Sequence, residues 1–167
     1  QAIGKHYNKD FLSLMPANLY GSFDNFDLQS SHVLPAMLRK FHEAKINNHS
    51  EVNVWGSGTP KREFLFVDDM AEAVVFALEN KLPEYLYNVG SGKEITIKEL
   101  AEIIQRVTGH QGEIVWDSSK PDGTLRKLLD VSKMKEMGWE YKTDLQQGIE
   151  KTYAWFLENM KNIKEVK

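Results

Sequence analysis

Short apolar runs and amphipathic helical patterns alternate along the chain, and this alternation constrains the fold more than any other feature. Apolar runs bounded by turn formers are typical of strands, and apolar stripes recurring every three or four residues are typical of helices. The alternation favours an α/β fold with a largely parallel sheet. Because such sheets bind ligands at the carboxyl ends of their strands, we expect chemistry in the loops 20–32, 56–62, 90–96 and 117–127.

Five apolar runs, at 11–18, 52–55, 64–67, 85–89 and 113–116, are predicted to be strands. The first, from Phe11 to Asn18, has little alternation and ends at turn residues, which predicts a strand buried on both faces in a parallel sheet.

Five helices are predicted. One carries Leu34, Met37, Leu38 and Phe41. A second is capped by Asp68 and has a core face of Met70, Ala71, Val74 and Leu78. The third has a capping box at 96–99, an apolar stripe and Gly109 as its stop. A short helix spans 130–137, and the last opens with a capping box at 143–146 and has a core stripe of Leu145, Ile149, Tyr153, Phe156 and Met160.

Composition narrows the function classes. A length of 167 residues fits one domain, and a net charge of -3 lacks the basic excess of a general nucleic-acid binder. The chain has no cysteine, so it forms no disulfide or thiolate metal site, and its histidines lack metal-ligand spacing. No apolar run approaches the roughly 20 residues of a membrane span. Gln1 opens a polar segment, so the chain looks like a piece of a longer protein.

Two Gly-x-Gly turns follow strand candidates, Gly56–Gly58 and Gly90–Gly92. A dinucleotide fingerprint needs a third glycine three residues later, but Lys61 and Ile95 stand there, which favours plain tight turns. The chain also lacks a Tyr-x3-Lys pair, in which a lysine lowers the tyrosine pKa. Hydride chemistry based on that pair therefore cannot be completed within this chain.

Two basic pairs, Lys61-Arg62 and Arg126-Lys127, lie in loops expected at strand ends. They are either solvated surface or cations for a phosphate. Trp55 lies close to the first pair in sequence and is either a half-buried strand residue or a face that stacks a base. His32, at a loop-to-helix junction, is either a capping or solvated residue or a group that reaches a ligand.

Four segments, 16–21, 31–44, 55–69 and 120–130, resemble in order and spacing the GDP-L-fucose synthase family of extended short-chain dehydrogenase/reductases. The resemblance runs from about Phe11 to Asn159, and the segments around His32 and at 120–127 (KPDGTLRK) are its most specific parts. Family members are roughly twice this length. The resemblance therefore implies that residues 1–167 are a C-terminal part, mixing the last Rossmann elements with a substrate-binding lobe and lacking the N-terminal NADP-binding part.

The resemblance implies conversion of GDP-4-keto-6-deoxy-mannose to GDP-L-fucose by two epimerisations and hydride transfer from NADPH. His32 would be the general acid of the epimerisations, a task that suits histidine, and it is also placed with the cofactor. The segment Pro16, Ala17, Asn18 and Leu19 would pass the nicotinamide. The GDP-sugar contacts would be Lys40, Trp55, Arg62, Asp122 and Lys127.

The glycine-rich turn, the Tyr-x3-Lys pair and a partner cysteine of this family are not in the chain, so we expect the isolated chain to lack full activity. Apolar faces beside 11–18 would need cover from the N-terminal half or a second copy, and the full-length family implies a homodimer. Two alternatives stay open: another GDP-sugar epimerase or dehydratase, and a non-catalytic nucleotide-sugar binding module.

Overall fold

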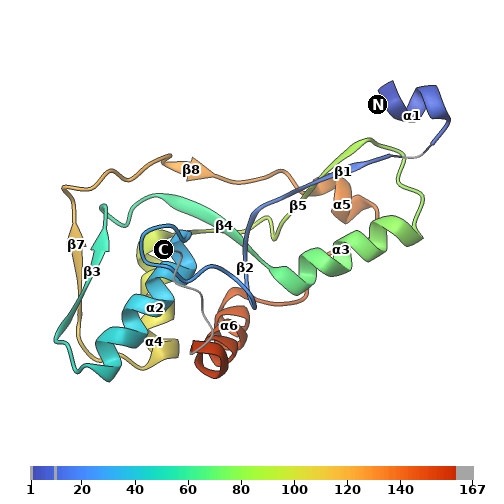
Figure 1. Ribbon diagram of the computed structural model, residues 1–167. Coiled ribbons are helices and arrows are strands. Elements are labelled where there is room, and N and C mark those ends of the chain that lie inside the picture. The colour runs from blue at the N-terminus through green and yellow to red at the C-terminus, as the bar shows by residue number, and fades with distance from the viewer. Residues whose placement is uncertain (1, 10, 161–167) are drawn as a thin grey trace.

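The computed structural model describes residues 2–9 and 11–160, and Figure 1 shows its elements. The helices are α1 (Ala2–Tyr7), α2 (Val33–Ile46), α3 (Val67–Glu79), α4 (Ile97–Thr108), α5 (Ser132–Glu136) and α6 (Leu145–Asn159). The strands are β1 (Ser13–Pro16), β2 (Asn18–Tyr20), β3 (Glu51–Trp55), β4 (Lys61–Phe66), β5 (Leu86–Val89), β6 (Glu94–Thr96), β7 (Glu113–Asp117) and β8 (Arg126–Lys127).

Parallel pairing predominates in the described residues. The pairs β1–β5, β2–β4, β3–β7 and β4–β8 are parallel, and β4–β6 is antiparallel. This confirms the predicted α/β class, although the strands form three separate sheets and not one. Strand β4 is the centre of the largest sheet, because it pairs with β2 through its second half and with β6 and β8 through its first half.

Helices α2, α4 and α6 gather at one end of the molecule (Figure 1). The predicted capping box of α4 is confirmed: the Glu99 N–H donates to the Thr96 hydroxyl, the Thr96 N–H donates to the Glu99 carboxylate, and Gly109 ends the helix in a left-handed conformation. We call the apolar cluster between these helices and the neighbouring strands the large core. Its buried residues are Tyr20, Phe26, Leu34, Met37, Leu38, Phe41, Ala44, Val52, Val54, Phe64, Phe66, Ile97, Leu100, Ala101, Ile104, Ile149, Tyr153 and Phe156.

The other end of the molecule holds β1, β5, α3 and α5 around a second cluster, which we call the small core. Its buried residues are Ala17, Leu65, Ala73, Tyr87, Val89, Met134 and Trp139. The expectation of one buried strand over 11–18 is wrong. The run divides at Ala17 into β1 and β2, and Phe11 and Met15 are 54% and 51% exposed.

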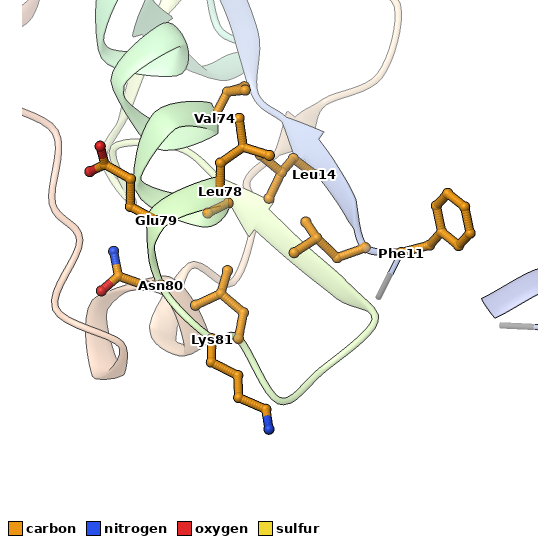
Figure 2. Close-up of a pocket in the computed structure, with 10 residues that line it drawn as sticks. Phe11, Leu14, Val74, Leu78, Glu79, Asn80 and Lys81 are labelled. Atoms are coloured by element: carbon orange, nitrogen blue, oxygen red, sulfur yellow. The ribbon is translucent and has the colours of Figure 1, made fainter. Parts of the chain in front are cut away.

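The predicted core face of α3 is wrong for three of its four residues: Met70 packs against the small core as predicted, but Ala71 is exposed. Val74 and Leu78 are exposed, and Ala73 and Ala77 face the protein instead. Asp68 is not the cap: the helix begins at Val67 after Phe66, and Asp68 lies in its first turn. Figure 2 shows Leu14 of β1 beside Leu78, and both line a groove of about 710 Å³.

Helix α6 forms as predicted, but with a different start. Asp144 caps it by accepting a hydrogen bond from the Gln147 N–H, in place of the capping box expected at 143–146. Ile149, Tyr153 and Phe156 are buried, whereas Met160 is exposed beyond the end of the helix. The fraying expected at 161–167 lies outside the described residues.

Candidate functional site

The pairing of β4 with β8 sorts the two basic pairs onto opposite faces. Arg62 lies beside Lys127 in the register, and Lys61 lies beside Arg126. Because side chains alternate along a strand, each of these partners shares a face. Glu94 forms ion pairs with both cations of one face, at 2.7 Å from Arg126 Nε and 3.6 Å from Lys61 Nζ. Arg62 and Lys127 are left together on the other face.

Asp122 joins the loop 117–127 to the turn after β3. Its two carboxylate oxygens accept hydrogen bonds from the Ser57 N–H at 2.6 Å and the Ser57 hydroxyl at 2.8 Å, and these bonds lower the pKa of the carboxyl. Gly56 is needed here, because it has φ +87° and a Cβ would collide with Asp122. A Cβ built on the next residue, Gly123, would be 3.8 Å from Arg62 Nη2. The hydrogen bonds between Asp122 and Ser57 therefore hold the loop 117–127 close to Arg62.

Trp55 ends β3 with 61% of its surface exposed, so it is not the half-buried strand residue that one interpretation expected. Lys40 Nζ lies 5.3 Å and Lys120 Nζ 5.6 Å from the centre of its ring. Partial burial lowers the pKa of Lys40, whose Nζ also donates to the Asn53 carbonyl at 3.2 Å. An aromatic face with two ammonium groups suits a flat base attached to phosphates.

A cavity of about 250 Å³ adjoins the Trp55 ring. It lies between β3, the start of α2 and the preceding loop, with Leu28, Ser31, Val33, Met37 and Lys40 among the lining residues.

His32 lies in sequence between the lining residues Ser31 and Val33, but it is not itself among the residues that line the cavity. It is the N-cap residue of α2 by position, but its exposed side chain makes no capping hydrogen bond in the described structure, which fits a solvated residue as well as one that reaches a ligand. Asp24 lies in the preceding loop, and burial raises the pKa of its carboxyl while the nearby His32 opposes that shift. Oδ2 of Asp24 is buried and has no hydrogen-bond partner among the described residues.

The segment Pro16, Ala17, Asn18 and Leu19 connects β1 to β2. The Ala17 N–H donates to the Val89 carbonyl at 2.9 Å, and Asn18 Nδ2 donates to the Glu63 carbonyl at 2.6 Å. These donors are used within the fold, and the described chain has no glycine-rich phosphate cradle near them. These four residues alone therefore do not make up the complete site of a dinucleotide.

The structure thus brings Arg62, Lys127 and Asp122 together and places Lys40 against Trp55. Sequence reasoning missed two side chains near these groups. Lys120 was noted only as part of a motif, although its place in the same polar loop as Asp122 was a usable signal. Asp24 had no signal beyond its loop, because its burial and its closeness to His32 depend on tertiary packing.

Parallel βα units with polar loops at the strand ends are typical of α/β proteins that bind nucleotides at the carboxyl ends of their strands. A profile of the NAD dependent epimerase/dehydratase family matches residues 1–90, and the chain belongs to that family.

Within that family, the chain is similar to GDP-L-fucose synthases. The chain is 54% identical over 165 residues to a probable GDP-L-fucose synthase 1 of Oryza sativa subsp. japonica, covering 99% of this chain and 50% of the relative. It is 50% identical to the GDP-L-fucose synthase of Escherichia coli K12, covering 95% of this chain and 52% of the relative. A crystal structure of a GDP-L-fucose synthetase from Naegleria fowleri bound to NADP matches with a TM-score of 0.89 at 31% identity, covering 98% of this chain and 52% of that one.

The chain therefore spans about half the length of the curated relatives it matches. Among residues 2–9 and 11–160, no helix is long and apolar enough to cross a membrane.

Proposed function

We propose that residues 1–167 are the C-terminal, substrate-binding part of a cytoplasmic enzyme of the GDP-L-fucose synthase type. The reaction is conversion of GDP-4-keto-6-deoxy-mannose to GDP-L-fucose by 3,5-epimerisation and NADPH-dependent reduction. One observation carries the proposal: Glu94 neutralises Lys61 and Arg126, whereas Arg62 and Lys127 share the opposite face beside the Asp122 loop. Two adjacent cations without that neutralisation suit a diphosphate.

The sites divide by chemistry. Arg62 and Lys127 bind the diphosphate, while Trp55 and Lys40 hold the guanosine end. Asp122 orders the loop through Ser57, which supports its place among the substrate-binding residues. His32 acts as the acid in the epimerisations: its side chain is exposed and makes no capping hydrogen bond in the described structure, and its two chain neighbours line the cavity.

NADPH supplies the hydride, and the segment Pro16, Ala17, Asn18 and Leu19 contacts its nicotinamide together with His32. The remaining cofactor contacts come from outside this chain. The open groove between β1 and α3 receives the N-terminal half of the enzyme or a second copy, in line with its apolar lining of Phe11, Leu12, Leu14, Val74 and Leu78. The complete enzyme is a homodimer in this proposal.

A GDP titration followed by tryptophan fluorescence tests the site. Arg62→Ala should weaken GDP binding by about 10- to 100-fold, because a charge-assisted hydrogen bond contributes about 1.5–3 kcal/mol. The matched control is Arg126→Ala, which removes the same group from the opposite face and should leave the affinity unchanged. Equal losses in both variants, or equal affinity for GDP and guanosine, would contradict the phosphate role of Arg62.

A second experiment tests the division of labour. The purified 167-residue chain, supplied with NADPH and the keto sugar nucleotide, should not oxidise NADPH, because the Tyr-x3-Lys pair and the glycine fingerprint are not in its sequence. A rate comparable to that of the Escherichia coli relative would show that this chain carries the hydride step after all.

A further inference from the structure

Glu63 is a carboxylate in the interior of the fold, with 1% of its surface exposed. It lies on β4, next to Arg62 in sequence. Oε1 accepts a hydrogen bond from the Gly92 N–H at 2.7 Å, and Oε2 accepts one from the Leu129 N–H at 2.9 Å. Burying a charge is costly unless it is well hydrogen-bonded, and here two backbone donors meet that need.

The turn Gly90–Gly92 is shaped around this carboxylate. A Cβ on Gly90 would collide with Glu63 Oε1, and Gly92 has φ +67°, a conformation that favours glycine. The Gly-x-Gly pattern after β5 therefore wraps a side chain of the protein, where a fingerprint would wrap a phosphate. The turn thus donates a hydrogen bond to the Glu63 carboxylate and leaves room for it.

Glu63 also joins the segments that carry the candidate site. Leu129 follows Lys127 by two residues, so the bond to Oε2 fixes the chain just after β8. The backbone carbonyl of Glu63 accepts from Asn18, in the proposed nicotinamide segment. One residue thus contacts the segments after β5, after β8 and at the start of β2.

We propose that Glu63 is a positioning residue that holds Lys127 beside Arg62 and keeps Asn18 in line with them. This inference rests on the proposed function. Glu63 touches no ligand in this account and acts through its neighbours. The charge matters because both oxygens must accept: a glutamine keeps the size but offers one oxygen and one NH₂, and that NH₂ would face a backbone N–H.

The test is Glu63→Gln, compared with Glu94→Gln as the control. Both variants remove one carboxylate, and the two residues are partners in the β4–β6 register, but Glu94 pairs with Arg126 and Lys61 and not with the Gly92 and Leu129 amides. We expect Glu63→Gln to weaken the binding of GDP by about tenfold, because Lys127, one of the two cations, is then held less firmly beside Arg62. The affinity for guanosine should stay unchanged, and the Gly92 and Leu129 amide proton resonances should move upfield. Glu94→Gln should alter neither the affinity nor those two resonances.

A second variant guards against misfolding of Glu63→Gln. Replacing the Leu129 peptide amide by an ester deletes only the donor to Glu63 Oε2. This change should weaken the binding of GDP by a similar factor and leave the Gly92 amide proton resonance unchanged. Parent-like GDP affinity in either folded variant overturns the positioning role alone. If the parent chain binds no GDP, the proposed function fails as well, so the two failures are distinguishable.

Discussion

The large core and the small core differ in how far each closes on itself. The large core is covered by α2, α4 and α6, and it contains 18 of the described buried residues against seven in the small core. The small core leaves apolar side chains at its surface, with Leu78 81% and Phe11 54% exposed. An exposed apolar patch of this kind marks an interaction surface more often than a solvated face.

The difference matters for the candidate site because its parts rest on different cores. Lys40, Trp55 and His32 stand on α2, β3 and the loop before α2, around the large core. Ala17 belongs to the small core. The proposed base-binding residues Lys40 and Trp55 therefore rest on the large core, whereas Ala17 of the proposed nicotinamide segment belongs to the small core.

The sharpest test of this comparison replaces one leucine by alanine in the large core and one beside the small core. Leu100 is fully buried in the large core, so Leu100→Ala should lower the free energy of unfolding by about 2–5 kcal/mol. Leu78→Ala should change it by no more than about 0.5 kcal/mol, because Leu78 is exposed. Urea denaturation of the two variants measures both values.

Protein concentration serves as the control for Leu78. If Leu78→Ala is as destabilising as Leu100→Ala, the exposed face is covered in solution, and the loss should then shrink on dilution. A large loss that is independent of concentration would contradict the description of α3 as open on that side.

Substitutions at the N-termini of α4 and α3 should change the stability by smaller and unequal amounts. Thr96→Ala removes the capping box of α4 and should cost about 1 kcal/mol, within a range of about 0.5–2. Asp68→Ala in α3 removes no cap and only a charge near the helix N-terminus, so its cost should be about 0.3–1 kcal/mol. Thermal melts at low and high salt discriminate, since salt should erase the Asp68 effect and spare most of the Thr96 effect. The reverse pattern would mean that Asp68 caps α3 in solution.

The elements themselves were predictable wherever local chemistry decided them. Thr96 and Glu99 specify the start of α4 by hydrogen bonds within four residues. The face of α3 was not predictable, because Val74 and Leu78 have the spacing of a core stripe and only the tertiary packing leaves them exposed.

The same limit applies to the candidate site. The sequence indicated Arg62 and Lys127 only through the family resemblance, and it treated all four cations of the two basic pairs alike. The β4–β8 register and Glu94 distinguish them. Glu63 drew no notice, since nothing local shows that a glutamate between Arg62 and Phe64 is buried against backbone donors 29 and 66 residues away in sequence.

The smallest effect is one of pH, and it vanishes at neutrality. His42 is buried in the large core with Nδ1 2.9 Å from the Tyr153 hydroxyl, and burial lowers its pKa against the opposing charge of Glu43. The unfolded chain, with a histidine pKa of about 6.5, then binds the proton more readily than the folded chain. Stability should be unaffected well above that pH and should fall as the pH drops from about 6.5 through the folded-state pKa.

His42→Gln keeps an acceptor for Tyr153 but does not titrate, so its unfolding free energy should lose this acid-dependent fall. His49→Gln, at an exposed histidine just after α2, should retain it. Denaturant unfolding at pH 7.5 and 5.5 measures the difference, and profiles that superimpose for the parent and His42→Gln would remove His42 as the source of acid sensitivity in the large core.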